Sequence, residues 1–317
     1  MEETSDDKSR KKNSDRVLPA CAFGDRLLHS EPACRGKVLP VSAQPARRHP
    51  VPLRRSVRKR RSKNIERAIS AGVIIFLLSA WWIVSEAGVF TSIILPSPAK
   101  VVSSFFRILN EGYSSISLLQ HLADSLYRLL FSFALVIVTA VPLGILSGFN
   151  AKVCAVFDPI VEFYRPLPPL GYYTLLVLWM GIENPSKIAL LYLAGFAPVF
   201  IACVSGVRKI RADYIDGAYT LGAGRWQTLL HVIFPACLPD IFTGLRTGIG
   251  VAYTTLVAAE MVAAVSGIGW MVLDASKFLR SDVIFVGIII MGLTGVLIDR
   301  ILRFIEKRVV HWKGKAE

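Results

Sequence analysis

Long apolar runs alternate with polar segments along most of this chain. Six runs are long enough, or can be extended far enough, to cross the ~30 Å hydrocarbon core of a bilayer as a helix. They cover residues 68–85, 129–151, 166–182, 188–207, 241–265 and 283–298. The fifth run is the weakest of the six because it contains Arg246 and Glu260. The pattern predicts an all-α polytopic membrane protein with six transmembrane helices.

The composition agrees with a membrane protein and shows where the basic residues lie. Hydrophobic residues make up 53% of the 317 residues, and the mean hydropathy is +0.49. Residues 1–67 hold 18 Lys and Arg against 8 Asp and Glu. A basic excess can indicate binding to nucleic acid. Here it directly precedes an apolar span, where such charges set the orientation of the chain in the membrane.

The loop charges predict that the N- and C-termini are both cytoplasmic. With six spans, one side of the membrane receives the basic N-terminal tail, the loop at residues 150–158, the segment 208–235 and the basic C-terminal tail. The other side receives few basic residues, which is the positive-inside asymmetry. Arg128 falls at the outer end of the second span, where we expect its long side chain to snorkel to the interface.

The organisation along the chain has four parts. Residues 1–64 form a basic tail that we expect to be disordered, and that either binds anionic lipid or results from a misassigned start site. Residues 65–120 contain the first span and an external amphipathic helix opened by Pro98. Residues 121–305 hold the other five spans, and residues 306–317 form a C-terminal tail.

Metal and disulfide chemistry find no support in the sequence. The five cysteines are odd in number and have no C-x-x-C spacing. The histidines show neither H-x-x-x-H nor H-E-x-x-H spacing. We therefore expect no metal site and no bound cofactor in this chain.

The polar segment 208–235 predicts two short amphipathic helices. One face of the first helix and one face of the second each repeat apolar or small residues at i, i+3, i+4 and i+7. These faces are Ile215, Ala218, Tyr219 and Gly222, and then Trp226, Leu229, Leu230 and Ile233. Each apolar stripe is too small to form a core by itself.

Capping residues set the expected ends of these helices. Asp213 is the expected N-cap of the first helix, and Gly222 and Gly224 are expected to stop it. Pro235 is expected to break the second helix before Pro239 opens the fifth span. Such helices either lie on the inner surface of the protein itself or dock into a cleft of a partner, and the small residues of the first helix would permit close approach.

A family resemblance favours the second alternative, in which these helices dock into a cleft of a partner protein. Asp216-Gly217-Ala218, Gly222 and the run 232–235 match the spacing of the signature E-A-A-x3-G-x9-I-x-L-P, with Asp in place of Glu and Gly in place of the first Ala. That signature is typical of the permease subunits of ATP-binding-cassette importers. The flanking segments 157–170, 181–199, 238–261 and 266–272 resemble the nitrate/sulfonate/taurine permeases, the taurine permeases most closely. The resemblance covers residues 68–313.

The resemblance implies a type I importer in the cell inner membrane. Such an importer has two permease subunits, here expected to be a homodimer, two cytoplasmic ATPase subunits and an external substrate-binding protein. The loop that couples the permease to the ATPase is implied to include Asp213, Asp216, Gly217, Ala218, Gly222, Ile233 and Pro235. The chain contains no G-x-x-x-x-G-K-[ST] phosphate-binding loop. We therefore expect a non-enzymatic subunit, with ATP and Mg²⁺ bound by the separate ATPase.

Candidate pathway residues lie in the fifth span. Gly244, Gly248 and Ala252 have the small-xxx-small spacing of close helix packing. Hydroxyls on its other faces either line a cavity or bond to the helix's own carbonyls. Ionisable residues there either face the pathway or pair with another span. The candidates are Arg246, Thr247, Thr254, Thr255 and Glu260, together with Thr243.

The function predicted from the sequence is ATP-driven uptake of a small anionic or zwitterionic solute, taurine or another organosulfonate. Nitrate and a pyrimidine precursor are alternatives within the same family. A self-sufficient secondary transporter is the alternative from another class, but the internal repeat of broken helices typical of that class is not evident. A membrane-bound enzyme has no paired catalytic residues to support it.

Overall fold

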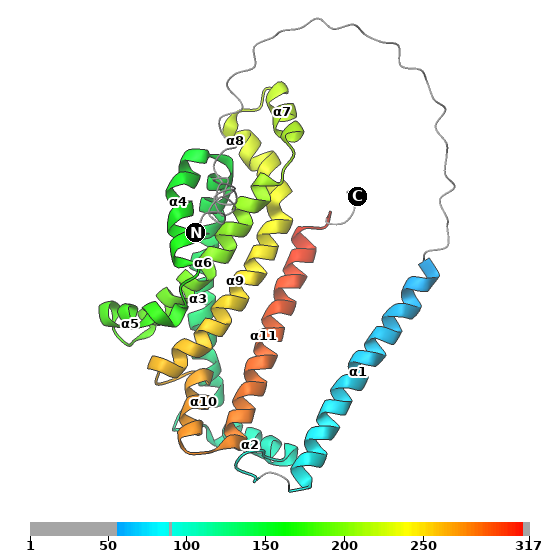
Figure 1. Cartoon of the computed structure of the whole chain (residues 1–317), viewed down its shortest axis with the longest axis vertical. Helices are drawn as coiled ribbons and strands as arrows, with labels where there is room; N and C mark the ends of the chain where they lie inside the picture. The colour runs from blue at the N-terminus through cyan, green and yellow to red at the C-terminus, as the bar shows by residue number, and fades with distance from the viewer. Residues whose placement is uncertain (1–55, 89–90, 313–317) are drawn as a thin grey trace, which may run out of the picture. The chain divides into compact units, whose positions relative to one another are not determined.

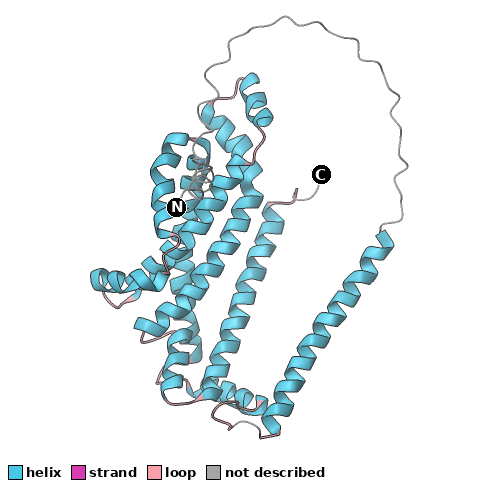
Figure 2. Cartoon of the chain, in the orientation of Figure 1, coloured by secondary structure: helices cyan, strands magenta, loops and turns pink. Residues whose placement is uncertain are grey.

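The computed structural model describes residues 56–88 and 91–312, and the side chains from residue 69 onward. Within these ranges the chain forms helices and turns, and its only β-type pairing is an isolated bridge between Tyr113 and Ile116 (Figure 2). The predicted all-α class is confirmed. The N-terminal tail is predicted to be disordered. Up to residue 55, this tail lies outside the described residues.

The described chain divides into two units, and the division falls at residue 103 inside α2. The first unit contains α1 (Ser56–Glu86), which begins within the segment assigned to the tail and includes the first predicted span. Helix α2 (Pro98–Glu111) begins at Pro98, as predicted. Residues 104–312 form the second unit, called the core unit below.

The core unit contains the other predicted spans. Five helices of the described chain are long and apolar enough to cross a membrane, and Pro169–Met180 is a shorter apolar helix. The six predicted spans are therefore five long helices and one short one. The helices of the core unit after α2 are α3 (Leu118–Phe149), α4 (Ala151–Tyr164), α5 (Pro169–Met180), α6 (Asn184–Arg208), α7 (Ala212–Thr220), α8 (Arg225–Thr228), the π-helix η3 (Leu229–Ile233), α9 (Phe234–Ala263), α10 (Ile268–Lys277) and α11 (Ser281–Val309).

Helix α6 is the centre of the core unit, with α3 and α9 packed along it (Figure 1). Two glycines set these close approaches. A Cβ atom at Gly144 of α3 would lie 2.6 Å from Cys203 Cβ, and one at Gly248 of α9 would lie 2.6 Å from Val199 Cγ2. Because lipid gives apolar helices no reason to associate by hydrophobicity alone, close van der Waals packing of this kind holds membrane helices together. The predicted small-residue packing of the fifth span is confirmed.

The third span is broken by prolines. Helix α4 ends at Tyr164, and α5 begins at Pro169 after a short link. Figure 1 shows α5 leaving the direction of α4, as expected where prolines remove backbone donors and exclude the helical conformation before them. The predicted bent entry is confirmed. The predicted loop at 150–158 is wrong, because Asn150 caps α4 by accepting a hydrogen bond from the Lys152 amide at 3.0 Å.

The packing of α9 on α6 generates a matched pair of substitutions. Gly248→Ala would place a methyl group 2.6 Å from Val199 Cγ2 and 3.0 Å from the Gly195 carbonyl oxygen. We expect a loss of about 1–3 kcal/mol in the free energy of unfolding from overpacking. Gly250→Ala, on the same helix with no atom within 4 Å, should be neutral or stabilising by about 1 kcal/mol. The thermal unfolding midpoint of the protein in detergent measures both, and equal midpoints would contradict the packing.

Candidate functional site

Helix α7 is held at one end of the core unit by a glycine-terminated turn. Gly222 has φ +85°, a conformation that favours glycine. The Gly222 amide donates to the Tyr219 carbonyl at 2.9 Å, and the Ala223 amide donates to the Ala218 carbonyl at 3.0 Å. This pair of bonds is a Schellman motif, so the prediction that Gly222 stops the helix is confirmed.

Two capping predictions need correction. The N-cap of α7 is Arg211, not Asp213, which lies in the first turn and pairs with the Arg211 guanidinium at 2.5 Å. A carboxylate in the first turn still stabilises the helix through its dipole. Gly224 does not end α7. It begins α8, where its amide donates to Gln227 Oε1 at 2.8 Å.

The α7 end of the core unit presents apolar side chains to its surroundings. None of the α7 residues is buried. Tyr214 is 61% exposed, Leu221 90% and Trp226 69%. Figure 1 shows α7 beyond the ends of the long helices. Tyr214 lies on α7, Leu221 follows it and Trp226 lies on α8, and exposed aromatic and aliphatic groups in such a short segment are typical of a surface that docks a partner.

The signature residues lie on this helix. Asp216 is exposed on α7, whereas Gly217 and Ala218 are half-buried, and Ile215 packs against the core. Of the predicted apolar stripe, Ile215 and Ala218 are half-buried, whereas Tyr219 and Gly222 are exposed. The contacts of Asp216, Gly217 and Ala218 with a partner stay a prediction.

The second helix continues into the fifth span. The predicted break at Pro235 is wrong: α8, η3 and α9 follow one another without a loop, and Arg225–Ala263 is one apolar span. The π-turn explains how the chain tolerates the proline, because the Phe234 amide bonds to the Leu229 carbonyl in the wider π pattern. Ile233 is fully buried, so it anchors this continuous helix in the core.

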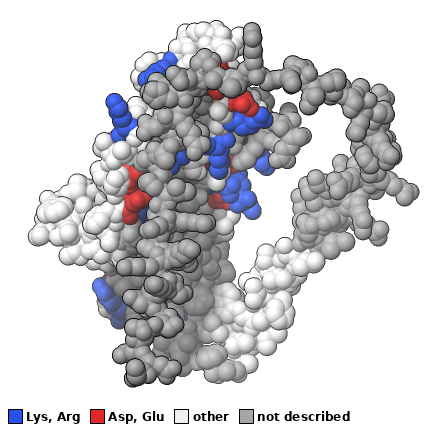
Figure 3. All heavy atoms as spheres, turned by 45° about the horizontal axis from the view of Figure 1, so that its top comes forward, with Lys and Arg blue, Asp and Glu red and all other residues white. Residues whose placement is uncertain are grey.

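Charges near the α7 end form short-range pairs. Lys209 Nζ lies 2.8 Å from an Asp240 carboxylate oxygen, and Arg208 Nη2 lies 3.6 Å from Asp158. In Figure 3, which brings this end towards the viewer, Lys and Arg side chains lie in separate groups, some of them beside Asp or Glu. These pairs join α6 to its neighbours α4 and α9.

Arg246 belongs to a cluster on α9 and α11. Its Nε atom lies 3.1 Å from Asp299 Oδ1, and its Nη1 atom lies 3.9 Å from Glu306 Oε2. Arg303 also bonds to Asp299. Pairing with another span is one of the two alternatives that the sequence left open for Arg246. Its contribution to a solute pathway stays a prediction.

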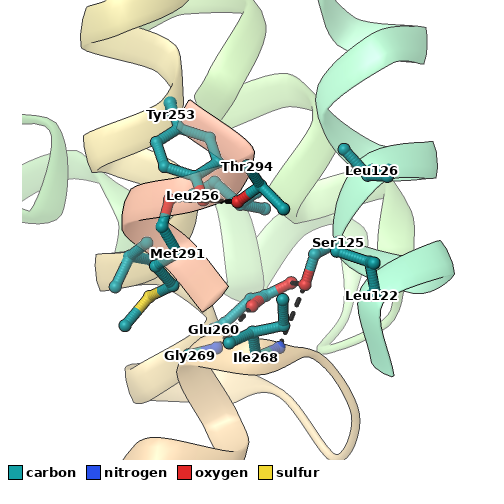
Figure 4. Close-up of a pocket in the computed structure, with 11 residues that line it drawn as sticks. Leu122, Ser125, Leu126, Tyr253, Leu256, Glu260, Ile268, Gly269, Met291 and Thr294 are labelled. Atoms are coloured by element: carbon teal, nitrogen blue, oxygen red, sulfur yellow. Dashed lines mark hydrogen bonds between the residues drawn. The ribbon is translucent and has the colours of Figure 1, made fainter. Parts of the chain in front are cut away.

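Glu260 forms a buried ion pair with Arg128. Arg128 Nη1 lies 2.8 Å from Glu260 Oε1, and the two side chains are 5% and 1% exposed. Ser125 donates to the same oxygen at 2.7 Å, and the Gly269 amide donates to Oε2 at 2.9 Å. Figure 4 shows the carboxylate of Glu260 between Ser125 and the start of α10. The snorkelling predicted for Arg128 is wrong, because a buried carboxylate satisfies its charge.

The network around this pair fixes the loop between α9 and α10. Arg128 Nη1 donates to the Ser266 carbonyl at 2.9 Å, and Ser266 donates to Asp124 at 2.5 Å. The Gly267 amide donates to His121 Nδ1 at 3.1 Å. Gly267 has φ +121°, and a Cβ atom there would overlap the Glu260 carboxylate. The loop is therefore tied to both α3 and α9.

Most of this network was missed in the sequence, although it carries a periodic signal. His121, Asp124, Ser125 and Arg128 have the spacing i, i+3, i+4 and i+7 of one helix face. Tyr113 lies in the loop that precedes α3. Burial and a 3.0 Å hydrogen bond to Asp274 raise the pKa of its hydroxyl to about 12. Tyr113 is therefore a neutral donor at physiological pH.

The threonines of α9 all bond to their own helix. Their Oγ1 atoms donate to carbonyls three or four residues back, at 2.8–3.0 Å. These threonines are Thr243, Thr247, Thr254 and Thr255. Thr243 and Thr247 also line a cavity of about 450 Å³, so for these two residues both alternatives hold. Thr255 is buried. That these hydroxyls contact solute stays a prediction.

The buried ion pair can be tested by a double-mutant cycle. Arg128→Gln or Glu260→Gln alone leaves an uncompensated buried charge, which costs about 3–5 kcal/mol. We expect either single variant to lower the thermal unfolding midpoint in detergent. The double variant should be less destabilised than the sum of the two, because residues in contact couple. Additive losses would show that the two side chains act independently.

Comparison with known proteins identifies the family. The family described as binding-protein-dependent transport system inner membrane component matches residues 140–311. The chain is 40% identical to the taurine transport system permease protein TauC of Escherichia coli over 250 residues, which are 78% of this chain and 91% of that protein. It is 33% identical to the putative aliphatic sulfonates transport permease protein SsuC of Bacillus subtilis, over 76% of this chain and 86% of that protein.

A nitrate permease is also similar. The nitrate import permease protein NrtB of Synechocystis is 30% identical over 82% of this chain and 98% of its own length. The resemblance seen in the sequence is thus confirmed at the level of the family. A permease of this class works with separate ATPase and substrate-binding subunits and does not itself hydrolyse ATP. The chain belongs to the binding-protein-dependent transport system inner membrane component family, as a multi-pass permease subunit of the taurine/sulfonate/nitrate group of ATP-binding-cassette transporters.

Proposed function

We propose that this permease imports taurine or a closely related organosulfonate. The observation that carries the proposal is the 40% identity with a permease named for taurine transport, extending over most of both chains. The similarity to a permease named for aliphatic sulfonates supports the same chemical class. Nitrate is the alternative within the family, on a lower identity.

We propose that the α7 end of the core unit faces the cytoplasm and that the chain works as a homodimer. The positive-inside distribution of Lys and Arg supports this orientation, with both termini cytoplasmic. ATP and Mg²⁺ are then bound by the ATPase subunits, and this chain needs no cofactor of its own. We also propose that the basic N-terminal tail binds anionic lipid on the same side of the membrane.

In this proposal α7 is the helix that couples the permease to the ATPase. Tyr214, Leu221 and Trp226 are the exposed apolar anchors that would enter a cleft of that subunit. Movement of the ATPase would reach the spans because α7 lies between α6 and the continuous helix that starts at Arg225. Because Ile233 is buried in the core, this helix would connect α7 to the fifth span rigidly.

Solute uptake tests the substrate. The permease, expressed with its ATPase and binding protein in cells lacking organosulfonate uptake, should accumulate radiolabelled taurine. Unlabelled organosulfonates should compete, and nitrate should not. A matched strain carrying an ATPase unable to hydrolyse ATP is the control and should show only background uptake. Nitrate-sensitive uptake, or nitrate uptake without taurine uptake, would contradict the assignment.

Co-purification tests the coupling surface. Leu221→Asp places a charge on a side chain that is 90% exposed, so the permease should fold while its apolar contact with the ATPase is lost. We expect recovery of the ATPase with the tagged permease to fall about tenfold or more, as for a buried interface anchor. Phe278→Asp, at the opposite end of the core unit and 68% exposed, is the control. Equal ATPase recovery from the two variants would exclude α7 as the docking helix.

A further inference from the structure

A cavity of about 450 Å³ opens between the link from α4 to α5, the middle of α6 and the first half of α9. Helix α6 lies between α4 and α9 in Figure 1 and supplies most of the apolar part of the lining. The volume falls within the range of ligand pockets, about 300–1,000 Å³.

The polar part of the lining comes from both sides of α6. Tyr164 and Arg165 lie at the end of α4, Tyr172 lies on α5, and Thr243 and Thr247 lie on α9. Apolar and small side chains separate them, including Leu193, Ala197 and Val251. The cavity therefore offers two separated polar groups across an apolar floor.

Arg165 is the only charged residue in this lining. Its side chain is exposed, and no ion pair to it occurs among the residues that the structure describes. Two arginines deeper in the spans have acidic partners: Arg128 pairs with Glu260, and Arg246 pairs with Asp299. Arg165 therefore stands in the cavity as a guanidinium with all its donors available, in the geometry that best matches an oxyanion.

The neighbouring hydroxyls complete the polar character. The Tyr164 hydroxyl is buried and has no hydrogen-bond partner within the described chain, which is rare enough to need an explanation. Thr243 and Thr247 donate their protons to helix carbonyls at 2.9 and 3.0 Å. Their oxygen lone pairs can therefore only accept, which suits an ammonium group and not an anion.

We propose that this cavity is a station on the solute pathway, where Arg165 contacts the anionic group and Thr243 and Thr247 accept from a cationic amino group. The chemical class that fits is a small zwitterion whose acidic oxyanion and ammonium are joined by a short carbon chain. This proposal rests on the proposed function. It adds the residues that would contact the solute inside the membrane. It places the solute contact at Arg165 rather than at the charged groups already paired within the spans.

Substitution of Arg165 tests the anion contact in the complete importer. Arg165→Gln should lower the maximal rate of taurine uptake about tenfold or more, the effect expected from losing a hydrogen bond to a charged group. Arg165→Lys keeps the charge and should retain more of the rate. Because the binding protein selects the solute outside the membrane, the taurine concentration for half-maximal uptake should change less than the maximal rate. Arg300→Gln, an exposed arginine on α11, is the matched control.

The outcomes separate this proposal from the proposed function. If the unmodified importer takes up no organosulfonate, the proposed function fails. If it takes up taurine and R165Q, assembled in equal amount, transports at the rate of R300Q, only the Arg165 site is overturned. A rate for R165K below that of R165Q would also overturn the contact, because it would show that a positive charge at this position impedes transport.

Thiol labelling provides a second measurement that does not depend on transport rate. In the assembled importer, Thr247→Cys should react with a small thiol reagent, and taurine during ATP turnover should slow the reaction. Val262→Cys, exposed on the same helix outside the cavity, should react at a rate that taurine leaves unchanged. Modification is read at the introduced cysteine by mass spectrometry. Absence of protection, or absence of reaction because a second copy fills the cavity, would overturn the proposal.

Discussion

Helix α9 approaches α6 so closely at Gly248 that even a methyl group would meet Val199 Cγ2 at 2.6 Å. This contact and the similar one at Gly144 of α3 place three long helices around one axis, and other features of the core unit depend on that placement. At one end α6 and α9 carry α7 between them. Along their length they leave a cavity beside the broken third span. Close packing of small residues is the main source of helix association that a bilayer allows.

Arginines within and beside the spans differ in whether they have an acidic partner. Arg128 with Glu260 and Arg246 with Asp299 are paired, and each pair joins two helices. Arg128 and Glu260 are buried, and removing one partner of a buried pair is strongly destabilising because it leaves an uncompensated charge. Arg165 differs from these arginines because it lines a cavity and forms no ion pair among the described residues. Its place in the cavity lining, together with the lack of an ion pair, is what marks Arg165 as a charge available to a ligand.

Much of this organisation can be predicted from the sequence, because apolar runs, proline positions and glycine turns act locally. Six spans, the turn at Gly222 and the bent third span follow from such signals. The ion pairs within the core unit cannot be predicted in this way, because they join residues that are distant along the chain. Glu260 and Arg128, for example, are 132 residues apart. The continuous helix through Pro235 was missed because a π-turn absorbs the missing donor. The cavity was missed because its residues come from three separate segments.

The most direct test of the account is an experimental structure of the complete importer with taurine and its ATPase. The account predicts Tyr214, Leu221 and Trp226 buried in a cleft of the ATPase, while α6 and α9 keep their contact at Gly248. Density for the solute should lie beside Arg165 in at least one state of the cycle. A structure in which α7 faces solvent and the ATPase contacts another helix would contradict the account.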